Sequence, residues 1–536
     1  MLSGLRFETA PPQRAVSPDR TDIACFIGFV ARRPGALLAD EQREALRAGG
    51  WVNGPWARSP QMLESLLQLP IALDSWDAFA RLFAWEQRPV SEGGSARCAS
   101  LLGAAVRSYF ATGGRRAIVI RAGDPFPALE ASGGRAANRA ARLHALIPAI
   151  ARPALPSQEA LPFDPGDPWL WRGTDHLYAL GEVCHVCLPD LPDVCAADPL
   201  PPPTAFTPAP PPEVFVECSA DEPALSGDDG LRGVQAPRSD EAGFIAWRDA
   251  TLEVCSFLTR WSLDMLFVGA LPLALPGTLH EDAATRTHAE TRLLDFLHGV
   301  GVLESATAPG DGTGTLGAHF AQIVWPWLRT TRSDDLPESL EPADGLFAGL
   351  LARNALLRGT FRSVGGVVLD DVVGLTPLPA AGLGPDNPTE ALAERLCVIA
   401  PEPEGRTVVS DVVTNMDISQ RFGGARRLML AIRRSARRFG EAHCFEPNGP
   451  ALWATLRRSF EDMLAAFWRE GAFAGANADE AYSVRCDRST MSQDDLDNGR
   501  LIAYVSVLPA AAITRITVVL DMSVGAGAGA QVREVA

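Results

Sequence analysis

The spacing of apolar positions predicts strands and helices in alternation near the start of the chain. Residues 22–30 (DIACFIGFV) form a short apolar run of the kind found in buried strands. Residues 99–114 repeat apolar side chains at helical spacing, and Gly113 is expected to end that helix. A strand over 115–123 and a helix over 133–150 are expected next. Strand, helix and strand in this order predict an α/β or α+β unit.

Helical periodicity dominates much of the second half of the chain. It is expected over 241–268 and 281–298, and it is most regular over 424–439 and 448–471. The last of these segments has a proline near its start and Gly471 at its end, as helices often do. Each of these segments is expected to bury one face.

Two strands are expected near the end of the chain, on either side of an acidic loop. They cover 481–486 and 501–507, and a third strand is expected over 512–524. The loop between the first two carries Asp494, Asp495, Asp497 and Asn498. A cation site, a catalytic carboxylate cluster and a solvated turn would each suit such a loop. The spacing does not match an EF-hand, whereas Asn498 and Gly499 suit the positive φ angles of a turn, so a structural turn is expected.

Composition changes sharply between residues 153 and 240. The segment 198–218 (DPLPPPTAFTPAPPPEVFVEC) is dense in proline and is expected to be largely extended, with polyproline II character. It is interpreted as a linker or as a loop of an inserted domain. Residues 1–20 lack periodicity and predict an N-terminal arm, and the glycine-rich tail 525–536 predicts a C-terminal arm.

Composition and charge exclude several classes of protein. At 536 residues the chain is too long for one core, so several domains are expected. Its net charge of −17 argues against broad nucleic-acid binding. All 48 basic residues are arginine, and the absence of lysine excludes P-loop and Schiff-base chemistry. The hydrolase motifs H-E-x-x-H and G-x-S-x-G are also absent from the sequence, so no enzyme is indicated.

The apolar runs predict no membrane insertion. They are interrupted by proline and glycine and are shorter than a bilayer span. The first residues lack the apolar stretch of a secretory signal. We therefore expect a soluble protein that begins in the cytoplasm.

The ten cysteines are scattered, mostly within apolar runs, which favours a reducing compartment. Cys184 and Cys187 have the C-x-x-C spacing of a zinc site. Cys195 and Cys218, or His185 in place of one of them, would complete four ligands. No second C-x-x-C pair exists, and the same run fits a buried strand. No metal or cofactor is expected, with zinc kept as the alternative.

A row of arginines crowds the expected helix 424–439. Like charges at helical spacing repel each other by a few tenths of a kcal/mol per pair. Neutralisation by acidic groups of the same chain, by a partner surface or by nucleic acid would each explain the row. Its members are Arg426, Arg427, Arg433, Arg434, Arg437 and Arg438.

The C-terminal third resembles the contractile tail sheath proteins of phages, R-type bacteriocins and extracellular contractile injection systems. The resemblance rests on F-E-P-N at 445–448 before a Trp-containing helix, E-A-Y-x-V-x-C-D at 480–487, and the acidic loop that closes into a strand. Weaker matches at 323–328 (IVWPWL) and 341–365, and in the first expected strand and helix, follow the family's order. The motif positions are Phe445, Glu446, Pro447, Asn448, Trp453, Gly471, Glu480, Ala481, Tyr482, Asp487, Asn498 and Gly499.

This resemblance implies a multidomain, mixed α+β tail-sheath-like fold, with a core built from N-terminal and C-terminal segments. The implied parts are an arm (1–20), a discontinuous sheath core (21–125 with 345–420), an inserted outer domain (126–344), a tube-proximal domain (421–524) and a second arm (525–536). The Pro-rich segment 153–240 would belong to the inserted domain.

The resemblance also implies a function without an active site. Copies of the chain or of paralogues would stack in rings around an inner tube protein and contract to drive the tube through a target envelope. Baseplate and terminal cap proteins would be further partners. The helix with the six arginines, or the helix over 450–470 after it, would face the tube. No nucleic acid or membrane is implied, and the protein would assemble in the cytoplasm before joining a phage tail or phage-tail-like particle.

Two departures from the family pattern keep an alternative open. The start of the chain lacks the family's P-G-V-Y-x-E-E-like sequence, and 508–521 (LPAAAITRITVVLD) lacks its Pro-x-Glu-Phe. Because these arms link neighbouring copies in the family, the chain could instead be a cap, a baseplate-proximal subunit or an adaptor. An enzyme that uses the same scaffold is the third possibility, with Cys184 and His185 as its candidate residues.

Overall fold

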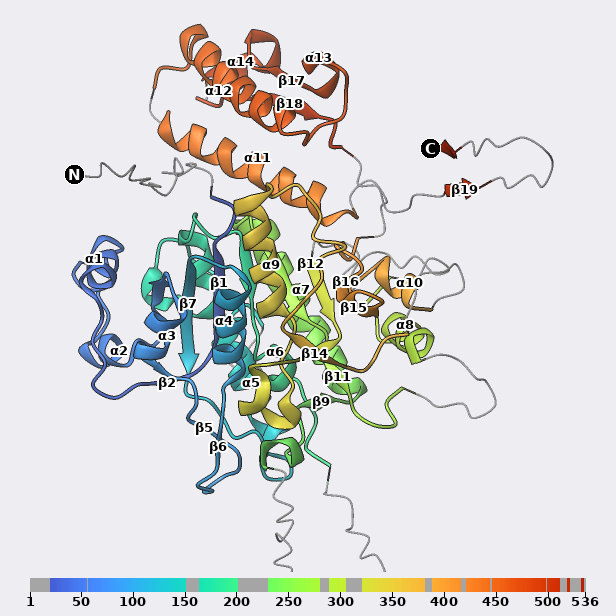
Figure 1. The fold of residues 1–536 in the computed structure, drawn as a ribbon. Coiled ribbons are helices and arrows are strands. Elements are labelled where there is room, and N and C mark those ends of the chain that lie inside the picture. Colours follow the sequence, from blue (N-terminus) through green and yellow to red (C-terminus); the bar gives the residue numbers. More distant parts are fainter. Residues whose placement is uncertain are drawn as a thin grey trace, which may run out of the picture. The chain divides into compact units, whose positions relative to one another are not determined.

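The computed structural model describes two compact units, Met1–Ser435 and Ala436–Ala536 (Figure 1). The described residues are 20–54, 56–150, 163–200, 230–279, 289–304, 321–380, 388–415, 421–443, 446–497, 499–510, 518–520 and 532–534. None of the helices in these ranges has the length and hydropathy of a membrane span.

An eight-stranded sheet organises the first unit. Its six inner strands run parallel, and the strand at each edge is antiparallel to its neighbour. From one edge to the other the strands are β16 (Gly405–Val408), β15 (Cys397–Glu402), β12 (Ala321–Trp325), β10 (Leu266–Ala270), β8 (His185–Cys187), β1 (Ala24–Phe29), β7 (Ala117–Gly123) and β3 (Pro70–Leu73).

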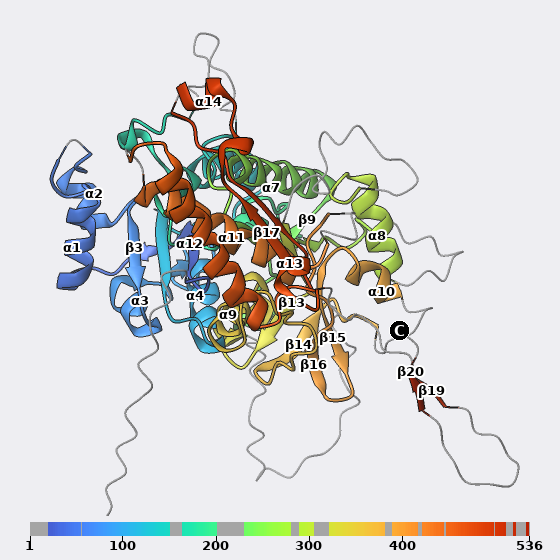
Figure 2. The same cartoon turned by 90° about the horizontal axis from the view of Figure 1, so that it is seen from above.

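Helices cover both faces of this sheet, because parallel strands are joined by crossovers that lie on the faces. One face packs against α5 (Gly134–Leu146), α7 (Glu241–Trp261) and α8 (Ala289–Gly299). The other packs against α3 (Trp76–Leu82), α4 (Leu101–Thr112) and α9 (Asp344–Leu357). Figure 2 shows α7 on the opposite side of the sheet from α4 and α9.

Alternate residues of β1 supply the two cores. Cys25 and Ile27 pack with the α7 side, whereas Ala24 and Phe26 pack with the α4 side. Because both sets are apolar, the strand appears in the sequence as an unbroken apolar run. The expectation of a buried strand over 22–30 is confirmed.

The elements expected near the start of the chain are present. The helix over 99–114 is α4, with Ser100 as its N-cap and Gly113, at φ 125°, as its C-cap. The strand over 115–123 is β7, and the helix over 133–150 is α5.

The later helical segments are also present, with different bounds. The expected helix 241–268 is α7, which ends at Trp261, followed by β10. Of the expected helix 281–298, the described part is α8, which begins at Ala289. The apolar run at 323–328 divides at Pro326 into β12 and β13 (Trp327–Thr330).

The separate inserted domain expected over 126–344 disagrees with the sheet. Strands β8, β10 and β12 all come from this range, and they lie between β1 and β15 of the expected core. Each is only three to five residues long, so its apolar run is too short to stand out from neighbouring loops. Of the Pro-rich segment 153–240, residues 153–162 and 201–229 lie outside the described residues.

Shorter elements complete the first unit. Its remaining helices are α1 (Asp40–Ala48), α2 (Pro60–Ser65), α6 (Leu191–Val194) and α10 (Pro388–Ala393), with 3-10 turns at Pro168–Leu170, Gly173–Ala179, Gly230–Gly233, Ser333–Asp335 and Pro337–Ser339. Its remaining strands are β2 (Ala31–Arg32), β4 (Phe83–Ala84), β5 (Arg88–Pro89), β6 (Arg97–Cys98), β9 (Arg238–Ser239), β11 (Leu273–Ala274), β13 and β14 (Val372–Thr376).

The second unit begins within the helix α11 (Gly423–Ala442) rather than at residue 421. The expected helix 448–471 is α12 (Pro450–Arg469), and Phe460 on it meets Phe439 with ring centroids 5.2 Å apart. The remaining elements are α13 (Ala478–Ala481), β17 (Tyr482–Arg485), a 3-10 turn (Arg488–Thr490), α14 (Gln493–Asp497), β18 (Tyr504–Val507), β19 (Val518–Leu520) and β20 (Val532–Glu534).

Two buried carboxyl groups lie where α4 and α9 meet the sheet. Asp190 Oδ2 accepts a hydrogen bond from the Phe29 N–H at 2.7 Å, and Asp344 Oδ1 accepts one from the Gly345 N–H at 2.9 Å. Burial raises the pKa of each carboxyl to about 7, although these backbone bonds oppose the rise. The nearby Asp190 adds to the rise at Asp344. Both side chains therefore bind a proton more tightly in the folded protein than in the unfolded chain.

We expect Asp344→Asn to change how stability depends on pH. The folded pKa lies above the ordinary 3.8, so the stability due to Asp344 is complete below that value and is lost as pH rises to about 7. Asparagine stays neutral, so its free energy of unfolding does not fall in this way. Relative to the wild type, the variant should therefore become more stable by on the order of 2–4 kcal/mol across this pH window. Urea unfolding at several pH values measures the difference. The exposed Asp370→Asn serves as control, and a difference at Asp344 that stays constant with pH would contradict the assignment.

Candidate assembly surfaces

The point where a doubly wound sheet usually binds a ligand is filled by side chains in this protein. Strand order reverses between β1 and β8, and ligands of such sheets lie beyond the carboxyl ends of the strands at this point. Here Asp193 of α6 is paired with Arg88 and with Arg135, whose Nη1 lies 2.8 Å from Asp193 Oδ1. Burial alone would raise the pKa of Asp193, but the two guanidiniums outweigh it and hold that pKa below its usual value. A buried ion triad thus occupies the position.

The possible zinc ligands do not converge. Cys187 packs in the core on the α4 side of the sheet and Cys195 in the core on the α7 side. Cys184 is hydrogen-bonded to Arg434, and Cys218 lies outside the described residues. The alternative of a zinc site is wrong for the three described thiols, because Cys187 and Cys195 lie in cores on opposite sides of the sheet and Cys184 contacts Arg434. In the described ranges no three His, Cys, Asp or Glu side chains are grouped to hold a metal ion.

The run 184–187 is the buried strand that the sequence also allowed. His185 is buried in β8, and burial lowers its pKa to about 3, helped by the charges of Arg427 and Arg434. Burial raises the pKa of the Cys184 thiol, against the opposing effect of Arg434. A neutral imidazole and a protonated thiol at these positions are suited to packing rather than to nucleophilic catalysis.

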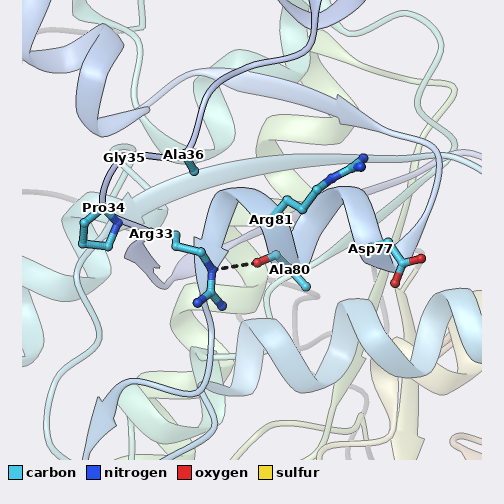
Figure 3. A pocket seen from close by; sticks show the side chains of 7 residues that line it. All are labelled: Arg33, Pro34, Gly35, Ala36, Asp77, Ala80 and Arg81. Carbon is cyan, nitrogen blue, oxygen red and sulfur yellow. Dashed lines mark hydrogen bonds between the residues drawn. The ribbon is translucent and has the colours of Figure 1, made fainter.

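A hollow of about 550 Å³ lies beside the loop that follows β2. Figure 3 shows Arg33, Pro34, Gly35 and Ala36 along one side and Asp77, Ala80 and Arg81 of α3 along the other. The Nε of Arg33 donates to the Ala80 carbonyl at 2.9 Å, and its Nη2 lies 2.7 Å from Glu86 Oε1. The guanidinium of Arg33 thus links the loop to α3.

The acidic loop of the second unit is built from its own hydrogen bonds. Residues 493–497 form the short helix α14, and Arg500 Nη2 lies 2.9 Å from Asp494 Oδ2 and 3.0 Å from Asp495 Oδ1. Asp495 Oδ2 also accepts a hydrogen bond from the Ser492 N–H at 2.9 Å. Gly499 has a φ of 68°, as expected for the turn, whereas Asn498 lies outside the described residues. The carboxylates Asp494 and Asp495 are therefore engaged within the loop.

The matched motif residues hold neighbouring turns in place. Asn448 accepts a hydrogen bond from Trp453 Nε1 at 2.7 Å and donates one to the Arg500 carbonyl at 3.1 Å. Glu480 accepts one from Asn477 Nδ2 at 2.7 Å at the start of α13. Gly471 ends α12 with a φ of 81°.

The remaining motif positions pack or cap turns within the same unit. Ala481 is fully buried, Tyr482 contacts Phe473 with ring centroids 6.2 Å apart, and Asp487 accepts from the Ser489 N–H at 2.7 Å. Glu446 and Pro447 lie in the turn before α12, and Phe445 lies outside the described residues.

Strands β17 and β18 form a two-stranded antiparallel sheet with two edges. They pair from Tyr482 with Val507 to Arg485 with Tyr504, and among the described residues neither has another strand beside it. α12 packs against β17. Tyr504 and Leu508 are 54% and 53% exposed. Unpaired edges of this kind accept additional strands.

Two arginines of α11 are buried in the first unit. Arg427 is 3% exposed, and its Nη1 and Nη2 reach Asp411 Oδ1 at 2.8 Å and Asp411 Oδ2 at 2.7 Å. Arg434 is 1% exposed; its Nη2 donates to the Val183 carbonyl at 2.7 Å and to the Asp264 carbonyl at 2.9 Å. The expectation that all six arginines face a partner is wrong for these two, because the chain supplies their neutralising groups.

The other four arginines differ from this pair. Arg433 is exposed, and its single described bond is a long one, 3.4 Å to the Leu263 carbonyl. Arg437 and Arg438 belong to the second unit, where Arg437 Nε lies 3.7 Å from Glu441 Oε1. Burial and the charge of Arg433 lower the pKa of Arg426 to about 10. These four remain candidates for a partner surface.

We expect Arg427→Met to destabilise the protein far more than Arg433→Met. The first substitution leaves the carboxylate of Asp411 buried without its partner, which costs about 3–5 kcal/mol. The second removes an exposed charge and should cost about 0–1 kcal/mol. Urea unfolding of the two variants measures both losses of stability. Equal losses would show that the buried pair of Arg427 and Asp411 does not stabilise the protein as expected.

No family model and no curated protein matches the chain. A chain in the contracted baseplate of the anti-feeding prophage (AFP) aligns with it at a TM-score of 0.56 and 16% identity, over 98% of this chain and 99% of that one. A chain in the six-fold symmetrised AFP baseplate aligns at 0.52 and 17%, over the same shares. A chain in the contracted AFP helical sheath aligns at 0.49 and 17%, also over 98% and 99%.

The full-length alignments with the two baseplate structures confirm the expected fold. They extend over almost the whole of both chains, so the likeness includes both units described above rather than the central sheet alone. At 16–17% identity they establish architecture and leave partners and activity to be inferred. The chain therefore has the multidomain α+β fold expected from its resemblance to contractile tail sheath proteins.

Proposed function

We propose that this chain is a structural subunit of a contractile sheath. It polymerises around an inner tube and contracts to drive the tube through a target envelope. The observation that carries the proposal is the full-length fold likeness to a chain of the contracted AFP baseplate, over 98% of this chain and 99% of that one. The ordered sequence motifs at 445–448 and 480–487 support the same family.

Strand addition is the proposed means of linking copies. The two open edges of the β17–β18 sheet support this role, because backbone N–H and C=O groups at an edge can pair with an extended segment. Residues 1–20 and 512–536 are the proposed donors. Main-chain hydrogen bonds would then keep neighbouring copies linked while the copies rotate between two packings during contraction.

The four arginines that are not buried in the first unit are the proposed contact with the tube. They are Arg426, Arg433, Arg437 and Arg438. Charge contacts that stay partly solvated weaken with ionic strength, and they separate more readily than a packed apolar interface. Such a contact suits a grip that must release on contraction. The further proposed partners are copies or paralogues of the chain, and baseplate and cap proteins, in a particle assembled in the cytoplasm.

A baseplate-proximal subunit, cap or adaptor is the second candidate. The two likenesses reported above with a TM-score above 0.5 are to chains in baseplate structures. The departures from the family pattern near both ends of the chain also favour this candidate, because a subunit at the end of a polymer needs fewer strand exchanges. Such a protein would keep the fold without building a long tube.

Negative-stain electron microscopy of the purified protein, alone and with the tube protein encoded beside it, decides between these candidates. A sheath subunit is expected to form hollow striated cylinders, wide when alone and narrower around a tube. Monomers or single rings in both samples, at concentrations well above those needed for assembly of a sheath, would contradict the sheath proposal and favour the second candidate.

Charge reversal tests the proposed tube contact. The triple variant Arg433→Glu, Arg437→Glu and Arg438→Glu should weaken tube binding by about tenfold or more, and the loss should shrink at high salt. Co-sedimentation with preformed tubes measures it. The exposed Arg358→Glu on the first unit is the control. Unchanged binding of the triple variant would remove these arginines from the contact.

A further inference from the structure

Aromatic side chains gather near the amino ends of β8 and β10. The ring of Phe163 lies 5.2 Å from that of Trp261 and 5.8 Å from that of Tyr178, and Tyr178 and Trp261 are 6.0 Å apart. Trp171 joins the group, 5.8 Å from Tyr178. We call the outer part of this group, Trp169, Leu170, Tyr178 and Trp261, the aromatic platform.

The platform is exposed although it is large and apolar. Trp169 is 47% exposed, Leu170 54% and Tyr178 42%. Single apolar residues on a surface need no explanation, but several large ones on one part of it mark a contact site. Arg58 links Trp169 to the group, because it lies over the rings of both Trp169 and Trp51, and Trp51 is 6.3 Å from Trp171. Trp and Tyr are also the residues that most often dominate the energy of protein interfaces.

The platform is held rigid from below. Arg58 is 6% exposed, its Nη2 donates to the Pro168 carbonyl at 3.0 Å, and its Nη1 donates to the Trp169 carbonyl. The same guanidinium lies over the rings of Trp51 and Trp169, at 5.0 Å and 5.6 Å from their centroids. A ligand therefore meets aromatic rings that are already in place, so little conformational entropy is lost on binding.

Rigid Trp and Tyr surfaces of this kind fit proline-rich segments. Such segments present flat pyrrolidine rings in an extended form that costs little entropy to bind. Arg172 and Arg260 are exposed at the margin of the platform, and Arg260 lies over the Trp261 ring at 5.1 Å. The nearby Asp164 and Asp167 accept backbone N–H groups of their own loop. An acidic, proline-rich chain thus matches the platform in shape and charge.

The protein itself contains a segment of this composition. Seven of the twelve residues 201–212 are proline, and Glu213 and Glu217 follow. We propose that the aromatic platform docks the proline-rich segment 201–212 of a second copy of this chain. The contact does not depend on the sheath role, since a ring or an adaptor could use it equally.

Leu200, which directly precedes the segment, lies at the opposite end of the sheet from the platform. The last described residue before the segment, Leu200, donates its N–H to Gln235 Oε1 at 3.0 Å, near β9. β9 pairs with β11, beyond the carboxyl end of β10. Trp261 instead ends α7, before the amino end of β10. This polarity favours a head-to-tail contact between copies over docking within one copy.

Binding of a synthetic peptide tests the proposal. A dye-labelled peptide of residues 198–218 is titrated into the full chain, and fluorescence anisotropy gives the Kd. We expect binding that weakens by about tenfold or more in the double variant Trp169→Ala and Tyr178→Ala. The matched control Leu357→Ala removes a side chain that is 60% exposed elsewhere on the unit and should leave the Kd unchanged. A peptide with its prolines replaced by alanine should also lose binding, and this arm leaves the protein intact.

A deletion variant identifies which copy supplies the segment. The peptide is titrated at low micromolar protein into the intact chain and into a chain lacking residues 201–212. Equal affinities support docking between copies. A segment docked in its own copy would act at millimolar effective concentration and weaken peptide binding to the intact chain by about tenfold or more, which would overturn the second copy as occupant. No binding to either chain, or equal binding of the alanine peptide, would overturn the platform itself. Neither failure bears on tube formation in the microscope.

Discussion

Parallel strands must be covered on both faces, and this constraint organises the first unit. Six parallel strands place every connection on a face, so α5, α7 and α8 pack on one side of the sheet while α3, α4 and α9 pack on the other. The interior then has to accommodate polar groups where helices meet strand ends. Asp193 does so with Arg88 and Arg135, and Asp411 with Arg427. The triad of Asp193, Arg88 and Arg135 therefore occupies the place where other doubly wound proteins bind ligands.

Much of this architecture could be predicted from apolar spacing. The buried strand β1, the helices α4, α5 and α12 and the strand β7 all carry long or strongly patterned runs. The role of β8 in the sheet could not be predicted in this way. It is three residues long, begins at His185 directly after Cys184 and ends at Cys187, and nothing local distinguishes such a strand from a loop or a metal site. Its place in the sheet depends on partners that are distant in sequence, so a separate inserted domain was the natural but incorrect inference.

For the arginine-rich helix α11, too, the sequence could not show which side chains are buried. Six arginines in sequence suggest one charged face, yet Arg427 and Arg434 point into the first unit, where carboxylates and carbonyl oxygens surround them. Their partners Asp411 and Asp264 lie on other segments, so spacing within the helix could not distinguish buried from exposed members. The aromatic platform was equally hidden, because Trp169, Tyr178 and Trp261 are brought together only by the fold. The acidic loop was easier to predict, because its residues contact each other locally.

The absence of lysine gives the interior pairs an asymmetric response to their surroundings. A guanidinium keeps its proton throughout the range in which proteins are handled, and, although burial alone would lower the pKa of Arg88, the charge of Asp193 raises that pKa further. Only the carboxylates can lose their charge, and the arginines beside Asp193 and Asp411 hold both pKa values below the ordinary 3.8. Their contribution to stability is present above that value and disappears only in strong acid. The buried ion pairs thus stay charged at any pH a cell provides, and any rearrangement within the first unit has to proceed around them.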